Sequence, residues 1–218
     1  MTDSLLEIAS IKTTYSDQPV LDDVSMEVDN DEVVALLGRN GAGKTTTLRS
    51  ITGVQPPYEG SIRFKGQEIK GLERYEIANL GIRYVPEDRR VFSKLTVDEH
   101  IAMVVDEDHR SKEAEFERIF DIFPDLKGLR DHQGENLSGG QQQMLAIARA
   151  LVGPSDILLL DEPTEGLAPK IIETILETID SLSAETTILL VEQNYQVTKQ
   201  VADRYYILDQ GQIVSRGP

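Results

Sequence analysis

The chain has 218 residues, no cysteine, and 22 basic against 38 acidic residues, which gives a formal net charge of −16. This length suffices for one domain with a sizeable buried core, and the lack of cysteine excludes a disulfide framework, a thiolate metal site and a cysteine nucleophile. No apolar run approaches the roughly 20 residues of a membrane-spanning helix, and the acidic balance disfavours a nucleic-acid partner.

The hydrophobic pattern alternates between strand-like and helix-like segments, which predicts an α/β fold. The N-terminal stretch to about Val28 predicts the strands of an antiparallel flap. Further strands are predicted at 33–37, 61–64, 82–85, 157–160 and 186–191, and around the turn 209–212. Helices are predicted after the glycine-rich turn to about 53, and over 111–124, 139–152, 168–182 and 195–202.

A dense run of charges begins at Glu87 and continues to about Gly134, where the pattern becomes mainly helical. We therefore predict a single domain over 1–218. Its α/β core comprises residues 1–86 and 153–218, and a helical subdomain over 87–152 is inserted into it.

A phosphate-binding loop is predicted between the strand 33–37 and the helix that follows it. The sequence GRNGAGKT fits the pattern GxxxxGK[ST], in which glycines let backbone N–H groups point at phosphate. Lys44 would supply positive charge to the β- and γ-phosphates, and Thr45 a hydroxyl to Mg²⁺. The alternative is a glycine turn with an incidental lysine, and the strand–loop–helix context favours the phosphate site. The residues assigned to this site are Gly38, Arg39, Asn40, Gly41, Ala42, Gly43, Lys44, Thr45 and Thr46.

Two carboxylates follow the predicted strand 157–160. Asp161 is suited to hold Mg²⁺ through water, and Glu162 is suited to activate an attacking water. An acidic pair at a strand end is often only solvated, but together with the glycine-rich loop it predicts a nucleotide-hydrolysis site.

The segment LSGGQ opens another predicted helix. Ser138, Gly139, Gly140 and Gln141 would leave free N–H groups at its N-terminus, where an anion binds. Because the glycine-rich loop already serves one nucleotide, a second phosphate-binding helix end implies a site shared between two subunits. The alternative is an ordinary capped helix.

The order of these motifs resembles the ATP-binding-cassette (ABC) ATPases over essentially the whole chain. GRNGAGKT is followed by a Val-Pro-acid segment, LSGGQ, ILLLDEP and a polar segment after TTILLV. The resemblance implies a P-loop NTPase with a RecA-like core, and head-to-tail dimers that enclose two ATP molecules with Mg²⁺. It also implies that Tyr15 stacks on adenine; the alternative for Tyr15 is a packed or half-exposed aromatic.

Four longer segments indicate which subfamily of the ABC ATPases the chain resembles. RYVPEDRRVFSKLTVDEHI, QQQMLAIARAL, DEPTEGLAP and LLVEQN are similar to the LivF-type ATPases of branched-chain amino-acid importers. That family implies a second ATPase subunit, membrane permeases, an extracytoplasmic solute-binding protein and a place at the cytoplasmic face of the membrane. ATPases of urea, short-chain amide or other amino-acid importers are the nearest alternative. An ABC ATPase that acts on nucleic acid or ribosomes, and a mainly regulatory half of a heterodimer, are two further alternatives.

Two residues depart from the general ABC pattern. Glu87 stands where a glutamine usually contacts Mg²⁺ and the lytic water, and its carboxylate brings negative charge near the γ-phosphate. Gln193 stands where a switch histidine is usual; it hydrogen-bonds phosphate but cannot take up a proton. The resemblance makes Gln193 a catalytic residue beside Lys44 and Glu162; the alternative is a solvated loop residue. The family usually continues past Pro218.

The remaining polar residues carry weaker expectations. His100, His109 and His132 lie outside the motifs, have no metal-ligand spacing and are expected to be solvated. Arg89 and Arg90, with Val91 and Phe92, are candidates for a permease-docking surface, and a solvated arginine pair is the equal alternative. The acidic excess suggests a protein adapted to high salt.

Overall fold

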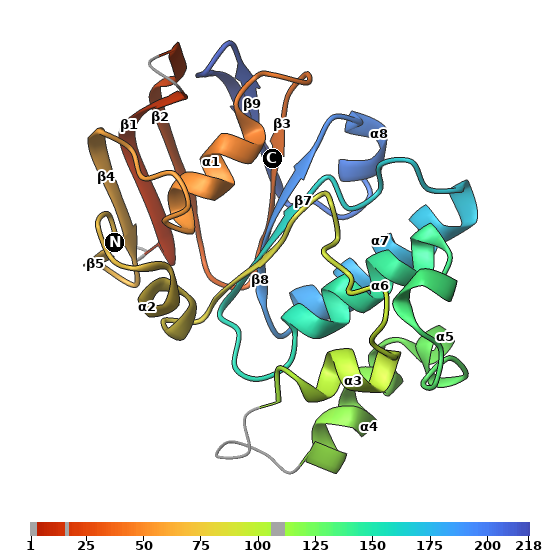
Figure 1. The fold of residues 1–218 in the computed structure, drawn as a ribbon. Helices are drawn as coiled ribbons and strands as arrows, with labels where there is room; N and C mark the ends of the chain where they lie inside the picture. The colour runs from red at the N-terminus through yellow and green to blue at the C-terminus, as the bar shows by residue number, and fades with distance from the viewer. Residues whose placement is uncertain (1–3, 16–17, 106–111) are drawn as a thin grey trace.

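Two sheets form the framework of the computed structural model, which describes residues 4–15, 18–105 and 112–218 (Figure 1). The smaller sheet is antiparallel, in the order β2-β1-β4-β5. The larger sheet has the order β10-β9-β3-β8-β7-β6, and its members are parallel except for the antiparallel pair β9–β10. The strands are β1 (Leu6–Tyr15), β2 (Gln18–Val28), β3 (Val33–Leu37), β4 (Glu59–Phe64), β5 (Gln67–Glu68), β6 (Ile82–Val85), β7 (Ile157–Asp161), β8 (Thr187–Glu192), β9 (Arg204–Asp209) and β10 (Gln212–Gly217).

The strand sequences explain this arrangement. Every residue of β3, β7 and β8 is buried, as expected for parallel strands covered on both faces. On β7, Ile157 and Leu159 face one hydrophobic cluster, and Leu158 and Leu160 face the other, because successive side chains of a strand point to opposite faces. The large sheet is thus the middle layer of the molecule.

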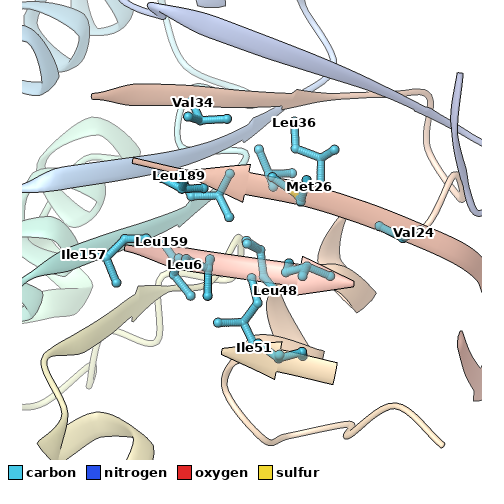
Figure 2. Packing of buried hydrophobic residues seen from close by; sticks show 14 of the residues in the cluster. Leu6, Val24, Met26, Val34, Leu36, Leu48, Ile51, Ile157, Leu159 and Leu189 are labelled. Atoms are coloured by element: carbon cyan, nitrogen blue, oxygen red, sulfur yellow. The ribbon is translucent and has the colours of Figure 1, made fainter. Parts of the chain in front are cut away.

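The antiparallel flap and helix α1 (Lys44–Ile51) cover one face of the large sheet. Figure 2 shows Leu6 and Met26 of the flap, Leu36 of the large sheet and Leu48 of α1 within one packed cluster. Each such side chain stabilises the fold by about 1.5–3 kcal/mol when it is fully buried. This cluster fixes the start of α1 relative to the end of β3, and so fixes the glycine-rich loop between them.

The other face of the large sheet packs against helices (Figure 1). Residues 87–152, predicted to be helical, contain the helices α3 to α6; the subdomain boundaries themselves remain predictions. The remaining helices are α2 (Arg74–Asn79), α3 (Val97–Ala102), α4 (Lys112–Ile122), α5 (Pro124–Lys127), the 3₁₀ helix η1 (Gly134–Asn136), α6 (Gly139–Ala150), α7 (Pro169–Ser183) and α8 (Tyr195–Thr198). Among the described helices, none is long and apolar enough to cross a membrane.

The predicted α/β architecture with an N-terminal antiparallel flap is confirmed, and the differences lie at element ends. The flap also includes β4 and β5. Helix α4 ends at Ile122 because Pro124 disfavours a helical conformation at Phe123, which has φ −122°. The helix predicted over 195–202 is shorter, since α8 ends at Thr198 and only hydrogen-bonded turns follow it.

The prediction of a solvated His100 is wrong. This side chain is completely buried on α3, where the backbone N–H of Phe92 and the carbonyl of Thr96 satisfy its two ring nitrogens. His132 is exposed as expected, and His109 lies outside the described residues.

Candidate functional site

The glycine-rich loop joins the end of β3 to the start of α1. Gly41 and Gly43 have φ values of +81° and +111°, in the left-handed region that favours glycine. A Cβ at Gly43 would also lie 2.6 Å from Cδ2 of Leu21 in the flap. Because no side chain caps α1 at Gly43, the first N–H groups of the helix remain available to phosphate oxygens.

Lys44 lies inside this loop with 3% of its surface exposed. Its Nζ donates hydrogen bonds to the carbonyl oxygens of Gly38 at 2.9 Å and Arg39 at 3.1 Å. It also lies 3.0 Å from Oε1 of Glu162. The geometry therefore joins the phosphate-loop lysine directly to the carboxylate predicted to activate water.

Glu162 occupies a strained backbone position immediately after β7. Its φ of +47° is unusual for a residue with a Cβ, and such strain clusters at functional sites. Its N–H donates to the carbonyl of Val191 at 2.9 Å, which ties the turn to β8. A side-chain hydrogen bond with Glu162, and the negative charge of that residue, raise the pKa of Glu165.

Asp161, the last residue of β7, is held by two hydroxyl groups. Thr45 donates to Oδ1 at 3.1 Å and Tyr84 of β6 donates to Oδ2 at 2.9 Å. Burial raises the pKa of Asp161, and the hydrogen bonds from Tyr84 and Thr45 act in the opposite direction. Burial also raises the pKa of Tyr84, so its hydroxyl stays protonated and donates to Asp161.

The pair of Thr45 and Asp161 fits a magnesium ion bound together with a nucleotide. Mg²⁺ is commonly held by one or two carboxylates plus substrate phosphates and water. Among the described residues, no group of three or more His, Cys, Asp or Glu side chains is placed to hold a metal. The hydroxyl of Thr45 and the carboxylate of Asp161 lie beside the phosphate loop, which matches a magnesium ion held jointly by protein groups, substrate phosphates and water.

A cavity of about 290 Å³ opens over the phosphate loop and Glu162. It brings together most of the predicted phosphate loop with Glu162 and Glu87, the latter carried by the loop after β6. The cavity is lined by Val20, Asn40, Gly41, Gly43, Lys44, Thr45, Thr46, Glu87, Glu162 and Glu165. Val20 and Glu165 were not predicted as site residues. Glu165 could have been found from the sequence, because it follows Glu162 by three residues in the same turn.

Other predicted site residues lie away from the lining of this cavity. Tyr15 is 63% exposed at the end of β1, where it pairs with Gln18 of β2. Gln193 is exposed after β8, next to Glu192, whose carbonyl accepts a hydrogen bond from Gly38 at 3.4 Å. Gly38 and Arg39 contribute through the carbonyl oxygens that Lys44 contacts, and Ala42 is buried in the loop.

The LSGGQ segment forms the capped start of α6. Ser138 Oγ accepts a hydrogen bond from the N–H of Gln141 at 3.3 Å, and Gln141 Oε1 accepts one from the N–H of Ser138 at 2.8 Å. The prediction of a free N–H group is therefore wrong for Gln141, whose N–H donates to Ser138. Gly139 lies against Arg89, because a Cβ there would meet Nη1 at 3.1 Å.

Two further residues connect the parts of the site and were missed in the sequence. Glu192 is 3% exposed, and its Oε1 accepts hydrogen bonds from the N–H of Thr164 at 3.1 Å and its hydroxyl at 2.7 Å. Gln143 of α6 accepts a hydrogen bond from Nε of Arg89 at 3.1 Å, and Nη2 of Arg89 reaches the carbonyl of Glu165 at 3.4 Å. Arg89 is thus an internal link, while its neighbour Arg90 is exposed and pairs with Asp88.

Comparisons with known proteins agree with this geometry. The family model of the ABC transporter matches residues 21–165. The high-affinity branched-chain amino acid transport ATP-binding protein BraG of Pseudomonas aeruginosa is 44% identical, over 96% of this chain and 91% of the relative. The probable branched-chain amino acid transport ATP-binding protein LivF of Archaeoglobus fulgidus is 35% identical, over 98% of this chain and 92% of the relative.

A third relative and a solved structure extend the comparison. The lipopolysaccharide export system ATP-binding protein LptB of Haemophilus influenzae is 34% identical, over 98% of this chain and 90% of the relative. A solved ATP-binding subunit of an ABC transporter superposes with a TM-score of 0.84 at 30% identity, covering 98% of this chain and 90% of that one. The chain therefore belongs to the ABC transporter family, as an ATPase of the LivF type.

Proposed function

We propose that this ATPase powers a membrane importer for branched-chain amino acids. The observation that carries the proposal is the 44% identity to BraG, which extends over 96% of the chain, with the 35% identity to LivF beside it. The chain would act at the cytoplasmic face of the membrane, bound through permease subunits. A solute-binding protein outside the membrane would deliver the amino acid.

In the proposed mechanism, the loop Gly38–Thr46 binds the phosphates of ATP and Lys44 contacts the β- and γ-phosphates. Mg²⁺, when bound by Thr45 and Asp161 with Glu87 beside them, would offset negative charge on the phosphate oxygens. Glu162 orients a water molecule and accepts its proton, and Gln193 hydrogen-bonds the γ-phosphate. The distance of 3.0 Å between Nζ of Lys44 and Oε1 of Glu162 supports this assignment, because a base beside the phosphate-binding lysine would lie close to the γ-phosphate.

A second ATPase subunit, identical or related, would complete each ATP site. The start of α6 at Ser138–Gln141 lies outside the lining of the ATP cavity, although its sequence is suited to bind phosphate. Two subunits arranged head to tail would bring this segment of one to the loop of the other. Tyr15, exposed on the flap, would stack on the adenine.

The permease would dock on the segment that follows β6. Phe92 is 52% exposed, next to the half-buried Val91, and Arg90 is exposed beside it. An exposed aromatic with an adjacent arginine is typical of protein interfaces. We assign no nucleic-acid partner to the acidic chain.

Reconstitution would test the solute. We would purify the tagged chain with the membrane proteins it retains, insert the complex into vesicles with ATP, and measure uptake of labelled leucine. Leucine uptake that is lost in the Glu162→Gln variant supports the proposal. Uptake of urea or a short-chain amide in place of leucine would contradict it.

An export role is the second candidate, because LptB, at 34% identity, is named for lipopolysaccharide export. The same preparation separates the two candidates. Retention of lipopolysaccharide-extracting permeases, with ATPase activity unaffected by leucine and its binding protein, would favour export and overturn the import proposal. If hydrolysis by this chain mixed with a sister subunit were unaffected by Glu162→Gln, the chain would instead be the regulatory half of a heterodimer.

A further inference from the structure

His100 is a buried histidine to which the ATP site assigns no role. It lies on α3 and is completely buried. Its Nε2 accepts a hydrogen bond from the N–H of Phe92 at 2.9 Å, and its Nδ1 donates one to the carbonyl of Thr96 at 2.7 Å. Because Phe92 offers a donor and Thr96 an acceptor, the geometry requires the neutral imidazole with its proton on Nδ1.

Phe92 lies within the loop between β6 and α3, which also carries Glu87 to the lining of the ATP cavity. Within this loop, Arg89 and Arg90 have φ values of +57° and +46°, two consecutive left-handed residues that each have a Cβ. Such a backbone persists only where its surroundings hold it in place. The loop therefore needs anchors outside itself.

Those anchors come from two helices. From α6, Arg149 donates to the carbonyl of Arg90 at 3.0 Å and to that of Arg89 at 3.4 Å. From α3, His100 binds the N–H of Phe92, and the two rings lie 5.9 Å apart. The loop also packs on Gly134, where a Cβ would lie 2.6 Å from the carbonyl oxygen of Phe92. His100 thus anchors the loop at Phe92, two residues beyond the left-handed Arg90.

We infer that His100 is a positioning residue for ATP hydrolysis, whose neutral imidazole binds the backbone of Phe92 and so fixes the loop that presents Glu87 to the nucleotide. The inference rests on the proposed role of Glu87 at the ATP site and is independent of the transported solute. The same bond joins α3 to the segment Arg90–Phe92, proposed above to contact the permease.

The surroundings of His100 keep the imidazole neutral. Burial lowers the pKa of His100, and the guanidinium of Arg149 on α6 lowers it further; the Thr96 carbonyl and the Glu99 carboxylate on α3 act in the opposite direction. If Nε2 carried a proton it could not accept a hydrogen bond, and two N–H groups would face each other at the contact with Phe92. The anchoring bond is therefore present above the pKa of His100 and is lost as pH falls through it.

Nitrogen-15 NMR of the histidine rings tests the tautomer. We expect the His100 signals to show a proton on Nδ1 and to titrate with a midpoint below the ordinary histidine value of 6.5. The exposed His132 serves as the reference, and the variants His100→Gln and His132→Gln assign the signals. A titration midpoint at or above 6.5, or a neutral ring with its proton on Nε2, would overturn the inference.

Steady-state kinetics test the function of the bond. His100→Gln keeps an acceptor near the position of Nε2, whereas His100→Leu removes it. We expect the leucine variant to lose about tenfold in kcat, the usual scale for residues that orient a site, with little change in KM for ATP. The glutamine variant should recover most of that loss, and His132→Gln should match the wild type.

Equal kcat losses in the leucine and glutamine variants, or none in either, would contradict the inference. If the leucine variant does not fold, the pH profiles decide: kcat of the wild type should fall more steeply between pH 7 and 5 than kcat of His100→Gln. Coincident profiles would overturn the inference. A wild-type chain without ATPase activity, both alone and in the complex it retains from the membrane, would instead overturn the function proposed for the site.

Discussion

Glu192 places a buried carboxylate between β8 and the turn that follows Glu162. Thr164 satisfies one of its oxygens through both its N–H and its hydroxyl. Burial raises the pKa of Glu192 above the ordinary value of 4.5. The folded protein therefore binds a proton at this carboxyl more readily than the unfolded chain does, and the charged form is disfavoured by folding.

The sign of this effect predicts the behaviour of Glu192→Gln. In the wild type, the carboxyl's contribution to stability is fully present below pH 4.5 and is lost as pH rises through the raised pKa. The glutamine keeps an acceptor for Thr164 and carries no charge, so we expect the variant to be the more stable protein at pH 7. This advantage should disappear below pH 4.5 in urea-unfolding measurements. The quantity to compare is the free energy of unfolding of the variant minus that of the wild type. A difference that is smaller at pH 7 than at pH 4 would contradict the prediction.

The chemistry of the motif residues could be predicted from the sequence, and the burial of isolated polar residues could not. Lys44, Glu162 and Thr45 lie in short segments whose spacing determines their geometry, and the structure brings them to one cavity. His100 and Glu192 are buried by elements distant in sequence, such as α6 over α3. The Thr96 carbonyl that binds His100 lies in the same segment, but nothing in either segment signals the distant elements that bury His100 and Glu192.

At the level of elements, α6 and α7 meet closely at one glycine. A Cβ at Gly140 would lie 2.5 Å from Cγ2 of Ile171 and 3.1 Å from its Cγ1. We expect Gly140→Ala to force the two helices apart and to reduce the free energy of unfolding by about 1–3 kcal/mol, the usual cost of overpacking. Urea denaturation measures the change.

Gly139→Ala is the matched control, because the new Cβ would lie 3.1 Å from the flexible end of Arg89 and in ordinary contact, at 3.7 Å, with Cδ2 of Leu167. Gly139 is the first residue of α6 and its φ lies outside the left-handed region, so alanine fits its backbone. The control should therefore be as stable as the wild type or more stable. Equal destabilisation by both substitutions would show that the contact with Ile171 is not the cause. Ile171→Ala combined with Gly140→Ala should restore part of the loss.

The positions of elements followed from periodicity, whereas their ends depended on local exceptions. The strands β3, β7 and β8 are short apolar runs next to turn residues, and all three were predicted. The end of α4 depends on how Pro124 restricts Phe123. After α8 the chain continues in hydrogen-bonded turns until the N–H of Asp203 donates to the carbonyl of Val33 on β3. The sheet order requires pairings between β3, β8 and β9, which no local pattern contains.

For the whole molecule, the net charge of −16 contrasts with the site that must bind a polyanion. Lys44 and Arg39 lie in the phosphate loop, while acidic side chains such as Asp22, Glu59 and Glu117 are exposed elsewhere. Self-repulsion of such a surface weakens as salt screens it. We therefore expect the melting temperature to rise between dilute buffer and molar KCl. A fold no more stable in molar KCl would contradict adaptation to high salt.

We propose that Glu162 activates water at an ATP site formed by the glycine-rich loop. Phosphate release by Glu162→Gln tests this role, with Glu173→Gln, a substitution at an exposed position of α7, as the control. We predict that turnover falls at least about 100-fold, as for a lost general base, that ATP remains bound, and that the variant elutes as a dimer with ATP. Turnover at the wild-type rate would contradict the claim.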